Sequence, residues 1–132
     1  MDEHFPSRRL QILVVEDHAD IRGVLDRYLN RMGHRVAVAC DLQDARTNLE
    51  KCRWDVLICD RNLPDGHGWD LLREMAEAQA PVYAVAMSAA ATKQDEADAS
   101  AAGFAQHLRK PFDLRELDKV VREALLRHPE ES

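Results

Sequence analysis

The stretch VLICDRNLPDGHGWDLL, residues 56–72, places an aspartate directly after four apolar residues. Such a short apolar run is typical of a strand that is covered on both faces of a parallel sheet. The segment that follows, NLPDGHG, is expected to be irregular, because Pro64 fixes φ while Gly66 and Gly68 permit turns that a side chain would block. The pattern therefore predicts that Asp60 is held at the tip of a buried strand.

The rest of the chain repeats this kind of run between helical patterns. The five predicted strands cover residues 10–15, 35–39, 55–59, 82–87 and 105–108. Apolar residues recur at helical spacing over residues 21–32, 42–52, 71–75 and 114–125, and the alanine-rich residues 89–102 form a further helix. Strands that alternate with helices pair in parallel through right-handed crossovers. We therefore expect one α/β domain, a doubly wound sheet of five parallel strands with five helices on its two faces.

Residues that favour helix ends support this division of the chain. The first and fourth helices are expected to end at glycines in the left-handed conformation, Gly33 and Gly103. Capping boxes are expected at the start of the fourth and fifth helices, from Thr92 with Asp95 and from Asp113 with Glu116. The fourth helix has no large apolar residue before Phe104, so we expect thin packing and the greatest freedom to move.

Composition limits the functional classes. The chain has 132 residues, 45% of them hydrophobic, and a formal net charge of −6, which suits one domain and disfavours a nucleic-acid surface. The start of the chain lacks the apolar core of a signal peptide and no run is long enough to span a membrane, so a cytoplasmic location is expected. Cys40, Cys52 and Cys59 lack CxxC spacing and are expected to be reduced and half-buried.

Polar residues gather where the predicted strands end. Glu16 and Asp17 follow the first strand, Asp60 the third, Ser88 the fourth and Lys110 the fifth. The carboxyl ends of parallel strands share one edge of the sheet, which is where doubly wound folds bind ligands. Two carboxylates about 4 Å apart repel by roughly 4 kcal/mol at an effective dielectric constant of about 20. An oxygen-only ligand set favours a hard divalent cation, so Mg²⁺ is expected there.

Four motifs in this order resemble the receiver domain of two-component response regulators. They are VVED after the first strand, ICDRNLPDGHG after the third, MSA after the fourth and KPF after the fifth. The resemblance covers residues 9–127 and implies a flavodoxin-like sheet of strand order 2-1-3-4-5. It also implies a role for each matching residue: Asp60 as phosphoacceptor, Glu16, Asp17, Asp60 and the backbone carbonyl of Asn62 as Mg²⁺ ligands, and Ser88 and Lys110 as phosphoryl contacts.

The resemblance also points to a switch residue. His107 lies three positions before Lys110, where the family usually has Tyr or Phe, whose inward or outward rotamer reports phosphorylation. Histidine departs from that commonest choice. We expect Ser88 and His107 to form the switch, with His107 turning inward once Ser88 is drawn toward the phosphoryl group.

Partners and organisation follow from the same resemblance. The phosphoryl donor is expected to be a histidine kinase or a histidine phosphotransfer protein, and the target to bind the fourth helix, fifth strand and fifth helix. The domain would be a switch that assists its own phosphorylation and dephosphorylation, rather than an enzyme. Neither direct nucleic-acid binding nor membrane binding is expected, and a phosphorylation-dependent homodimer is left open. Residues 1–8 and 128–132 are expected to be a flexible segment and a polar tail.

Several alternatives remain at this point. The chain could be a stand-alone regulator, or a receiver module from a hybrid histidine kinase or larger regulator in a phosphorelay. An aspartate-nucleophile, Mg²⁺-dependent phosphatase would want a second aspartate two positions after the first, where this chain has Asn62. An FMN carrier would need a glycine- and hydroxyl-rich loop in place of EDHADIR. A pseudo-receiver scaffold has no reason to retain every residue of the rim.

Overall fold

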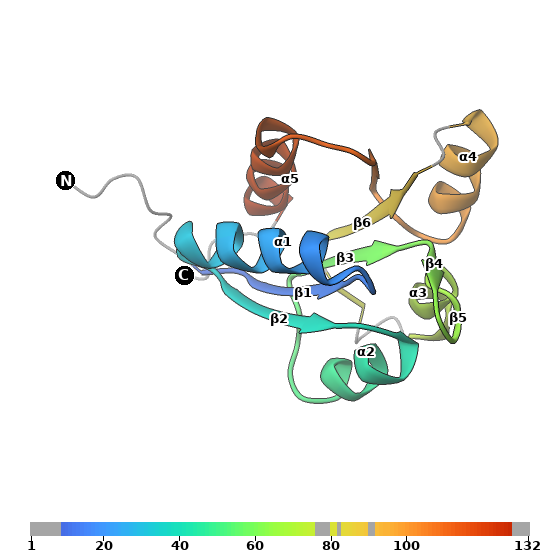
Figure 1. Cartoon of the computed structure of the whole chain (residues 1–132), viewed down its shortest axis with the longest axis horizontal. Helices are drawn as coiled ribbons and strands as arrows, with labels where there is room; N and C mark the ends of the chain where they lie inside the picture. The colour runs from blue at the N-terminus through green and yellow to red at the C-terminus, as the bar shows by residue number, and fades with distance from the viewer. Residues whose placement is uncertain (1–8, 76–79, 82, 90–91, 128–132) are drawn as a thin grey trace.

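A computed structural model describes residues 9–75, 80–81, 83–89 and 92–127 and has a five-stranded parallel sheet at its centre (Figure 1). The sheet order is β2-β1-β3-β6-β7, which is the predicted 2-1-3-4-5 because β6 and β7 are the fourth and fifth strands of the sheet along the chain. The strands are β1 (Gln11–Val15), β2 (Arg35–Ala39), β3 (Val56–Asp60), β6 (Tyr83–Ser88) and β7 (Gln106–Arg109). The predicted fold class is confirmed.

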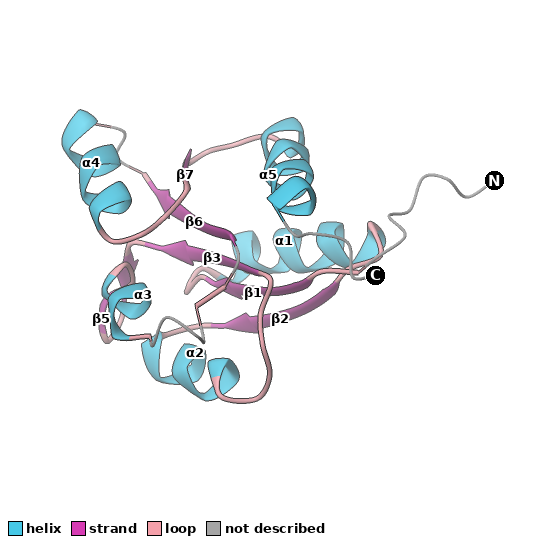
Figure 2. Cartoon of the chain, turned by 180° about the vertical axis from the view of Figure 1, so that it is seen from behind, coloured by secondary structure: helices cyan, strands magenta, loops and turns pink. Residues whose placement is uncertain are grey.

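Helices cover both faces of this sheet (Figure 2). They are α1 (Ala19–Arg31), α2 (Leu42–Leu49), α3 (Asp70–Glu74), α4 (Lys93–Ala101) and α5 (Leu114–Arg127). Alternate residues of the central strands point to opposite faces, so Ile12 and Ile58 pack with α1 and α5, whereas Leu13 and Leu57 pack with the other three helices. Among the described residues, no helix has the length and apolar composition needed to span a bilayer.

The predicted helix ends are present. Gly33 and Gly103 have φ values of 98° and 105° and follow the last turns of α1 and α4. Thr92 and Asp95 form a reciprocal capping box at α4. Asp113 and Glu116 likewise exchange side-chain to backbone hydrogen bonds of 3.0 Å each at α5. These helix ends could be predicted from the sequence because each depends on residues that are close together along the chain.

Two predictions about the α2 region are wrong. The helix ends at Leu49, so Cys52 lies outside it and is exposed, as is Cys40; only Cys59 of the three is buried. Trp54 explains the early end, because its indole Nε1 donates a 3.0 Å hydrogen bond to the carbonyl of Asn48 in the last turn. Trp54 itself is buried and belongs to the core cluster that α2 packs against.

The segment after Asp60 is more regular than predicted. It contains a short antiparallel pair, β4 (Asn62–Leu63) with β5 (Gly66–His67). Asp65, in the turn between them, accepts hydrogen bonds of 2.8 and 3.0 Å from the backbone N–H groups of Leu42 and Gln43. The turn therefore caps the first turn of α2, a contact across more than twenty residues that local patterns do not reveal.

Two faces of the helical layer are thinly covered. The buried residues of α4 are Asp95 and Ala99, which confirms the expected thin packing, while its movement stays a prediction. In α1, Val24 belongs to the predicted apolar face but its exposed fraction is 46%. It lines a groove beside the polar rim, described below.

Candidate functional site

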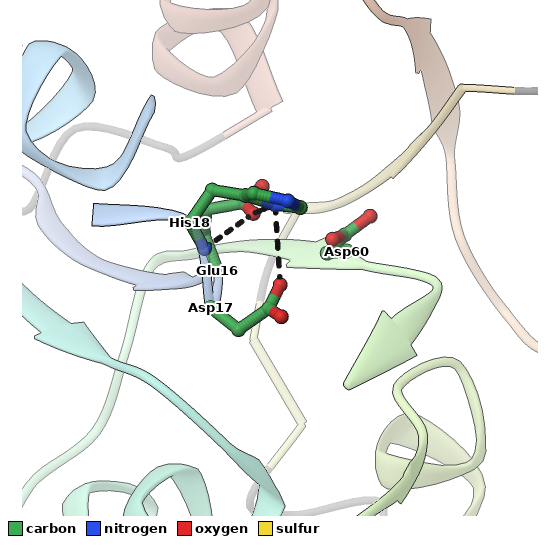
Figure 3. Close-up of side chains that lie close together, drawn as sticks. All are labelled: Glu16, Asp17, His18 and Asp60. Carbon is green, nitrogen blue, oxygen red and sulfur yellow. Dashed lines mark hydrogen bonds and ion pairs between the residues drawn. The ribbon is translucent and has the colours of Figure 1, made fainter. Parts of the chain in front are cut away.

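The carboxyl ends of the strands bring together the predicted acidic residues (Figure 3), and Lys110 lies beside them. Glu16 and Asp17 follow β1, Asp60 is the last residue of β3, and Lys110 follows β7. Glu16 and Asp60 are buried, with exposed fractions of 0% and 5%. The four apolar residues of β3 before Asp60 are all buried. They fix the Asp60 carboxylate at the edge of the sheet, so the position of this carboxylate depends on the core and not on a loop.

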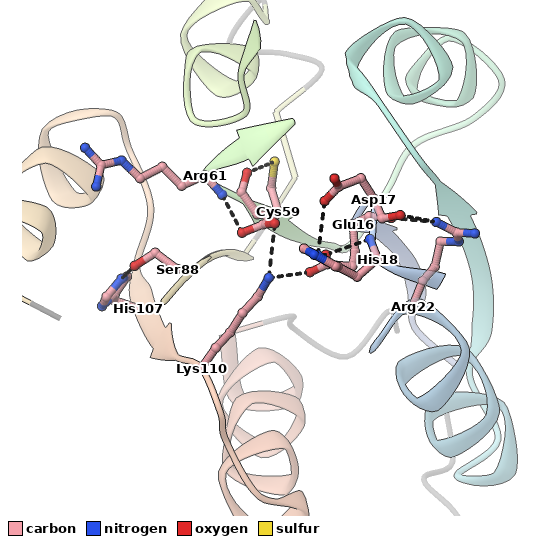
Figure 4. Close-up of polar contacts among 10 residues, drawn as sticks. Glu16, Asp17, His18, Arg22, Cys59, Arg61, Ser88, His107 and Lys110 are labelled. Atoms are coloured by element: carbon pink, nitrogen blue, oxygen red, sulfur yellow. Dashed lines mark hydrogen bonds and ion pairs between the residues drawn. The ribbon is translucent and has the colours of Figure 1, made fainter. Parts of the chain in front are cut away.

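Lys110 bridges two of the carboxylates (Figure 4). Its Nζ lies 2.8 Å from Oε1 of Glu16 and 3.1 Å from Oδ2 of Asp60. Burial alone would lower the pKa of Lys110, but these two carboxylates outweigh burial and raise it above the ordinary value. The ammonium is therefore held charged between the two acids.

The two acids respond differently to this environment. Burial favours a raised pKa for Glu16, but Lys110 and the backbone and ring of His18 outweigh it and the pKa is lowered. Burial and the nearby charge of Glu16 raise the pKa of Asp60, and this shift is only partly opposed by Lys110 and the N–H of Arg61. One ammonium therefore does not fully compensate the acidic rim.

The residues of the rim fit a divalent cation. One ligand atom from each of Glu16, Asp17, His18 and Asp60 lies within 4.8 Å of the other three. Oδ1 of Asp17 is a buried atom with no hydrogen bond among the described residues. A buried carboxylate oxygen without a donor is costly unless a cation or water completes it. The spacing of the donors and this oxygen fit a divalent cation, but the His18 nitrogen in the cluster departs from the oxygen-only ligand set that was expected.

Gly68 allows the loop after Asp60 to fold back over the strand. A Cβ at this position would lie 2.0 Å from the carbonyl oxygen of Asp60, so no larger residue fits. Its N–H donates a 2.6 Å hydrogen bond to the carbonyl of Arg61. Gly66 has a φ of 154°, consistent with the turn predicted for it. Asn62 is exposed in β4, and the role of its carbonyl as a metal ligand stays a prediction.

The other side of the rim is formed by Ser88 and His107. Oγ of the buried Ser88 lies 2.7 Å from Nε2 of His107, and the His107 ring meets the Trp69 ring edge-on with centroids 5.7 Å apart. The His107 ring therefore contacts Ser88 directly, and its turning inward on phosphorylation stays a prediction.

Three positioning residues were missed from the sequence. Arg22 of α1 donates hydrogen bonds of 2.9 and 3.2 Å to the carbonyls of Glu16 and Asp17, which fixes the backbone of the acidic loop. Arg61 lies 5.6 Å from the centre of the Trp69 ring and 2.6 Å from Oδ1 of Asp95. His18 lies beside the acids, and its ligating chemistry was the one signal that could have drawn attention to it.

An apolar groove opens beside Lys110. It has a volume of about 490 Å³ and runs between α1 and the segment that joins β7 to α5. Ile21, Val24 and Leu25 line one side, and Pro111 and Phe112 line the other. The groove shares Lys110 with the polar rim, so a molecule bound in it would lie beside the lysine that contacts Asp60.

Buried Cys59 takes no part in this chemistry. Burial, followed by the charges of Asp60 and Glu16, raises the pKa of its thiol well above the ordinary range. The thiol stays protonated, lying 3.4 Å from the carbonyls of Asp60 and Gly68. Cys59 is therefore a packing residue beneath the site.

Comparison with known proteins agrees with this geometry. The chain is 36% identical over 117 residues to the KDP operon transcriptional regulatory protein KdpE of Escherichia coli K12, covering 89% of this chain and 52% of KdpE. It is 38% identical over 124 residues to the response regulator protein PilR of Pseudomonas aeruginosa, covering 92% of this chain and 28% of PilR. The chain thus spans about half or less of the length of these curated relatives.

Solved structures share the fold. A two-component response regulator from Clostridium difficile superposes with a TM-score of 0.86 at 23% identity, covering 92% of this chain and 100% of that one. The non-phosphorylated HemR receiver domain from Leptospira biflexa gives 0.81 at 24% identity, covering 94% and 98%. Residues 12–122 match the response regulator receiver domain family as a whole. The chain therefore belongs to the receiver-domain family of two-component response regulators.

Proposed function

We propose that this domain accepts a phosphoryl group on Asp60 from the phosphohistidine of a histidine kinase or a phosphotransfer protein. The observation that carries the proposal is the bridge of Lys110 between Glu16 and Asp60, with Nζ 2.8 and 3.1 Å from their oxygens. It sets a buried nucleophilic carboxylate, a cation-binding pair of acids and an ammonium at one point. Receiver domains generally serve as phosphoacceptor switches, which agrees with this arrangement.

Each residue would have a defined part in the transfer. An Asp60 oxygen attacks phosphorus, the N–P bond to the donor histidine breaks, and an acyl phosphate forms. Lys110 would keep its charge and contact the transferred oxygens. A Mg²⁺ ion held by Glu16, Asp17, Asp60 and the Asn62 carbonyl would neutralise charge on the phosphoryl group. Rigid placement of Asp60 by β3 supplies the orientation that phosphoryl transfer requires. The same groups would assist the later hydrolysis of the acyl phosphate.

The groove beside Lys110 favours a protein donor. Its apolar lining, including the 46% exposed Val24, leaves a surface that a helix of the donor could cover. A histidine on such a helix would approach Asp60 past Lys110, which belongs to both the groove and the rim. The donor histidine could therefore approach Asp60 through an open site, with no prior closure of the domain around it.

The output surface would lie on the side of His107. A second cavity of about 290 Å³ lies between α4 and β7, lined by residues that include Phe104 and His107. We propose that a target protein binds across α4, β7 and α5, and that a phosphorylation-dependent homodimer would use the same face. Residues 9–127 would form the receiver. The predicted flexible segment, residues 1–8, and the predicted polar tail, residues 128–132, lie outside the described residues. The proposal applies both to a domain that acts alone and to a receiver module within a longer chain.

Intact-mass spectrometry after incubation with acetyl phosphate tests the phosphoacceptor. The native protein should gain one phosphoryl group only when Mg²⁺ is present, and hydroxylamine should remove it. Asp60→Asn should gain none. Asp70→Asn, which changes an exposed aspartate in α3, is the matched control and should behave like native protein. A metal-independent adduct that survives on Asp60→Asn would refute the assignment.

A further inference from the structure

The side chain of His18 lies beside the proposed cation site. His18 follows the two acids of the β1 loop, and its Nδ1 lies 3.0 Å from Oε2 of Glu16 and 3.4 Å from Oδ1 of Asp17. Figure 3 shows its ring beside the side chains of Glu16 and Asp17. We infer that His18 supplies a nitrogen ligand, and that the site binds a borderline divalent metal ion such as Co²⁺ more tightly than Mg²⁺. This inference rests on the proposed cation site.

The distances agree with shared coordination. Imidazole nitrogen and carboxylate oxygen lie about 2.0–2.2 Å from an ion such as Zn²⁺. Two such ligands at right angles on one ion are therefore about 3 Å apart. The separations of Nδ1 from the Glu16 and Asp17 oxygens, 3.0 and 3.4 Å, match that value. The Asp60 oxygen, within 4.8 Å of the others, is close enough to join the same ion after a small shift.

In the structure the Nδ1 of His18 makes a 3.0 Å hydrogen bond with Oε2 of Glu16, a contact that a bound ion would replace. His18 occupies the N-cap position of α1, where Ser, Thr, Asp or Asn is preferred, yet its side chain makes no capping hydrogen bond. Its backbone N–H and carbonyl do the structural work, bonding to Glu16 Oε2 and to the N–H of Arg22 at 3.0 Å each. The ring is 68% exposed, so binding an ion costs it little rearrangement.

A second observation points to a ligand at this place. Oδ1 of Asp17 is a buried atom that makes no hydrogen bond among the described residues, and the His18 Nδ1 lies 3.4 Å from it. Arg22 holds the backbone carbonyls on either side of this pair, at 2.9 and 3.2 Å from Glu16 and Asp17. The loop is therefore fixed with one unsatisfied oxygen and one imidazole nitrogen facing the same point.

Ligand chemistry sets the preference. Carboxylate, carbonyl and water oxygens suit Mg²⁺, whereas imidazole suits first-row transition metals and adds little for Mg²⁺. Replacing one water by Nδ1 should therefore raise the affinity for Co²⁺ selectively. On ion binding the Nδ1 lone pair would face the ion in place of the hydrogen bond to Glu16, which leaves the ring N–H on Nε2 toward solvent.

The test compares Co²⁺ and Mg²⁺ on tag-free protein by calorimetry. His18→Phe keeps a ring without nitrogen, and His67→Phe is the matched control because His67 is exposed near the site but outside the ligand cluster. His18→Phe should weaken Co²⁺ by about tenfold or more and change Mg²⁺ by less than about twofold. His67→Phe should change neither affinity.

A spectroscopic readout identifies the ligand directly. The Co²⁺ form in water should show one hyperfine-shifted, exchangeable imidazole N–H proton signal that His18→Phe removes and His67→Phe retains. Equal Co²⁺ affinity in native and His18→Phe protein, with that signal absent from both, would overturn the inference while Mg²⁺ binding still stood. By contrast, Asp17→Asn with undiminished affinity for both ions would refute the cation site itself.

Discussion

Oγ of Ser88, at the end of β6, lies 2.7 Å from Nε2 of His107 in β7, and the two strands are neighbours in the sheet. This contact links the polar rim to the face formed by α4 and β7. His107 in turn packs edge-on against Trp69, whose ring also contacts Phe104. A phosphoryl group on Asp60 that drew the Ser88 hydroxyl toward itself would therefore remove a hydrogen bond from His107.

The first prediction concerns this link. Beryllofluoride, a phosphate analogue, should perturb backbone amide signals across residues 88–110, beyond the residues that touch it. Ser88→Ala should shrink the distant changes, because the hydroxyl that connects the rim to His107 is gone. Two-dimensional ¹H–¹⁵N NMR on both proteins, with and without the analogue, measures this.

A control separates switching from binding. Ser88→Ala should still bind beryllofluoride and still be phosphorylated on Asp60, since neither the carboxylate nor Lys110 is altered. If native protein binds the analogue and the distant signals stay in place, Ser88 and His107 do not form a switch, although phosphoryl transfer could proceed.

The second prediction concerns the ion pair that ties α4 to the loop after Asp60. Arg61 Nη1 lies 2.6 Å from Oδ1 of Asp95, whose other oxygen accepts the 2.9 Å hydrogen bond from the Thr92 hydroxyl. Hydrogen bonds to Thr92, ahead of the charge of Arg61, lower the pKa of Asp95. Asp95→Asn should therefore lower stability and speed amide hydrogen exchange in α4.

The exposed pair of Arg73 with Asp70 provides the comparison. Its side chains are 56% and 53% exposed, against 30% and 7% for Arg61 and Asp95. Exposed pairs contribute about 0–1 kcal/mol, so Asp70→Asn should change the urea midpoint little. Equal effects of the two substitutions on stability and on α4 exchange would show that the Arg61 contact does not hold the helix.

The sequence was sufficient for the fold and for the acids and the lysine of the rim, but not for His18 beside them. Alternating runs define the five sheet strands, and parallel topology then places every strand end on one edge, so the approach of Lys110 to Asp60 could be anticipated without coordinates. The prediction required only the position of each residue along its strand. It did not depend on rotamers or on contacts between separate helices.

The contacts that were missed depend on side-chain directions across distant parts of the chain. Arg61 and Asp95 are 34 residues apart, and nothing local to either residue indicates that they meet. The apolar pattern of α2 continues to Cys52, but the helix ends at Leu49, where the Trp54 indole donates a hydrogen bond to the carbonyl of Asn48. The edge-on contact of His107 with Trp69 likewise joins residues that are far apart in the sequence.

The third prediction tests the close approach at Gly68. Gly68→Ala would place a Cβ 2.0 Å from the Asp60 carbonyl and 3.0 Å from the buried Cys59 thiol, so the loop must shift. We expect a loss of about 2 kcal/mol or more in the free energy of unfolding, and weaker phosphorylation of Asp60. Urea denaturation and the acetyl phosphate assay measure the two effects.

Gly23 provides the matched control. It lies within α1, and a Cβ there would meet only the flexible end of Arg27, at 3.2 Å. Gly23→Ala should therefore stabilise the protein by about 0.5–1 kcal/mol, because alanine is the better helix former. If Gly68→Ala is as well tolerated as Gly23→Ala, the loop is not held in the described position.

The fourth prediction is that stability falls in mild acid because of His34. This side chain is buried, and its Nδ1 accepts a 3.1 Å hydrogen bond from the backbone N–H of Leu10. Nε2 is buried without a hydrogen-bond partner among the described residues. Burial lowers the pKa of His34 below the ordinary value of 6.5. Protonation of Nδ1 would also place its N–H against the backbone N–H of Leu10, and the hydrogen bond between them would be lost.

The sign of the pH effect follows from that shift. Below about pH 6.5 the unfolded chain takes up a proton at His34 that the folded chain resists. The unfolded state then binds more protons, so the free energy of unfolding decreases as the pH is lowered. Above that value His34 is neutral in both states and contributes no slope. The loss from this residue is at most about 1.4 kcal/mol per pH unit and stops below the folded pKa.

Urea denaturation of native protein, His34→Asn and His67→Asn between pH 7.5 and 5 isolates the effect. Asparagine can still accept a hydrogen bond from the Leu10 N–H but has no group that titrates in this range. His34→Asn should therefore cost some stability at pH 7.5 and then lose less than native protein as the pH falls, so that the two curves converge. His67→Asn removes an exposed imidazole and controls for the change in residue type. Parallel curves for native and His34→Asn protein would mean that His34 is protonated equally in the folded and unfolded states, contrary to its burial against Leu10.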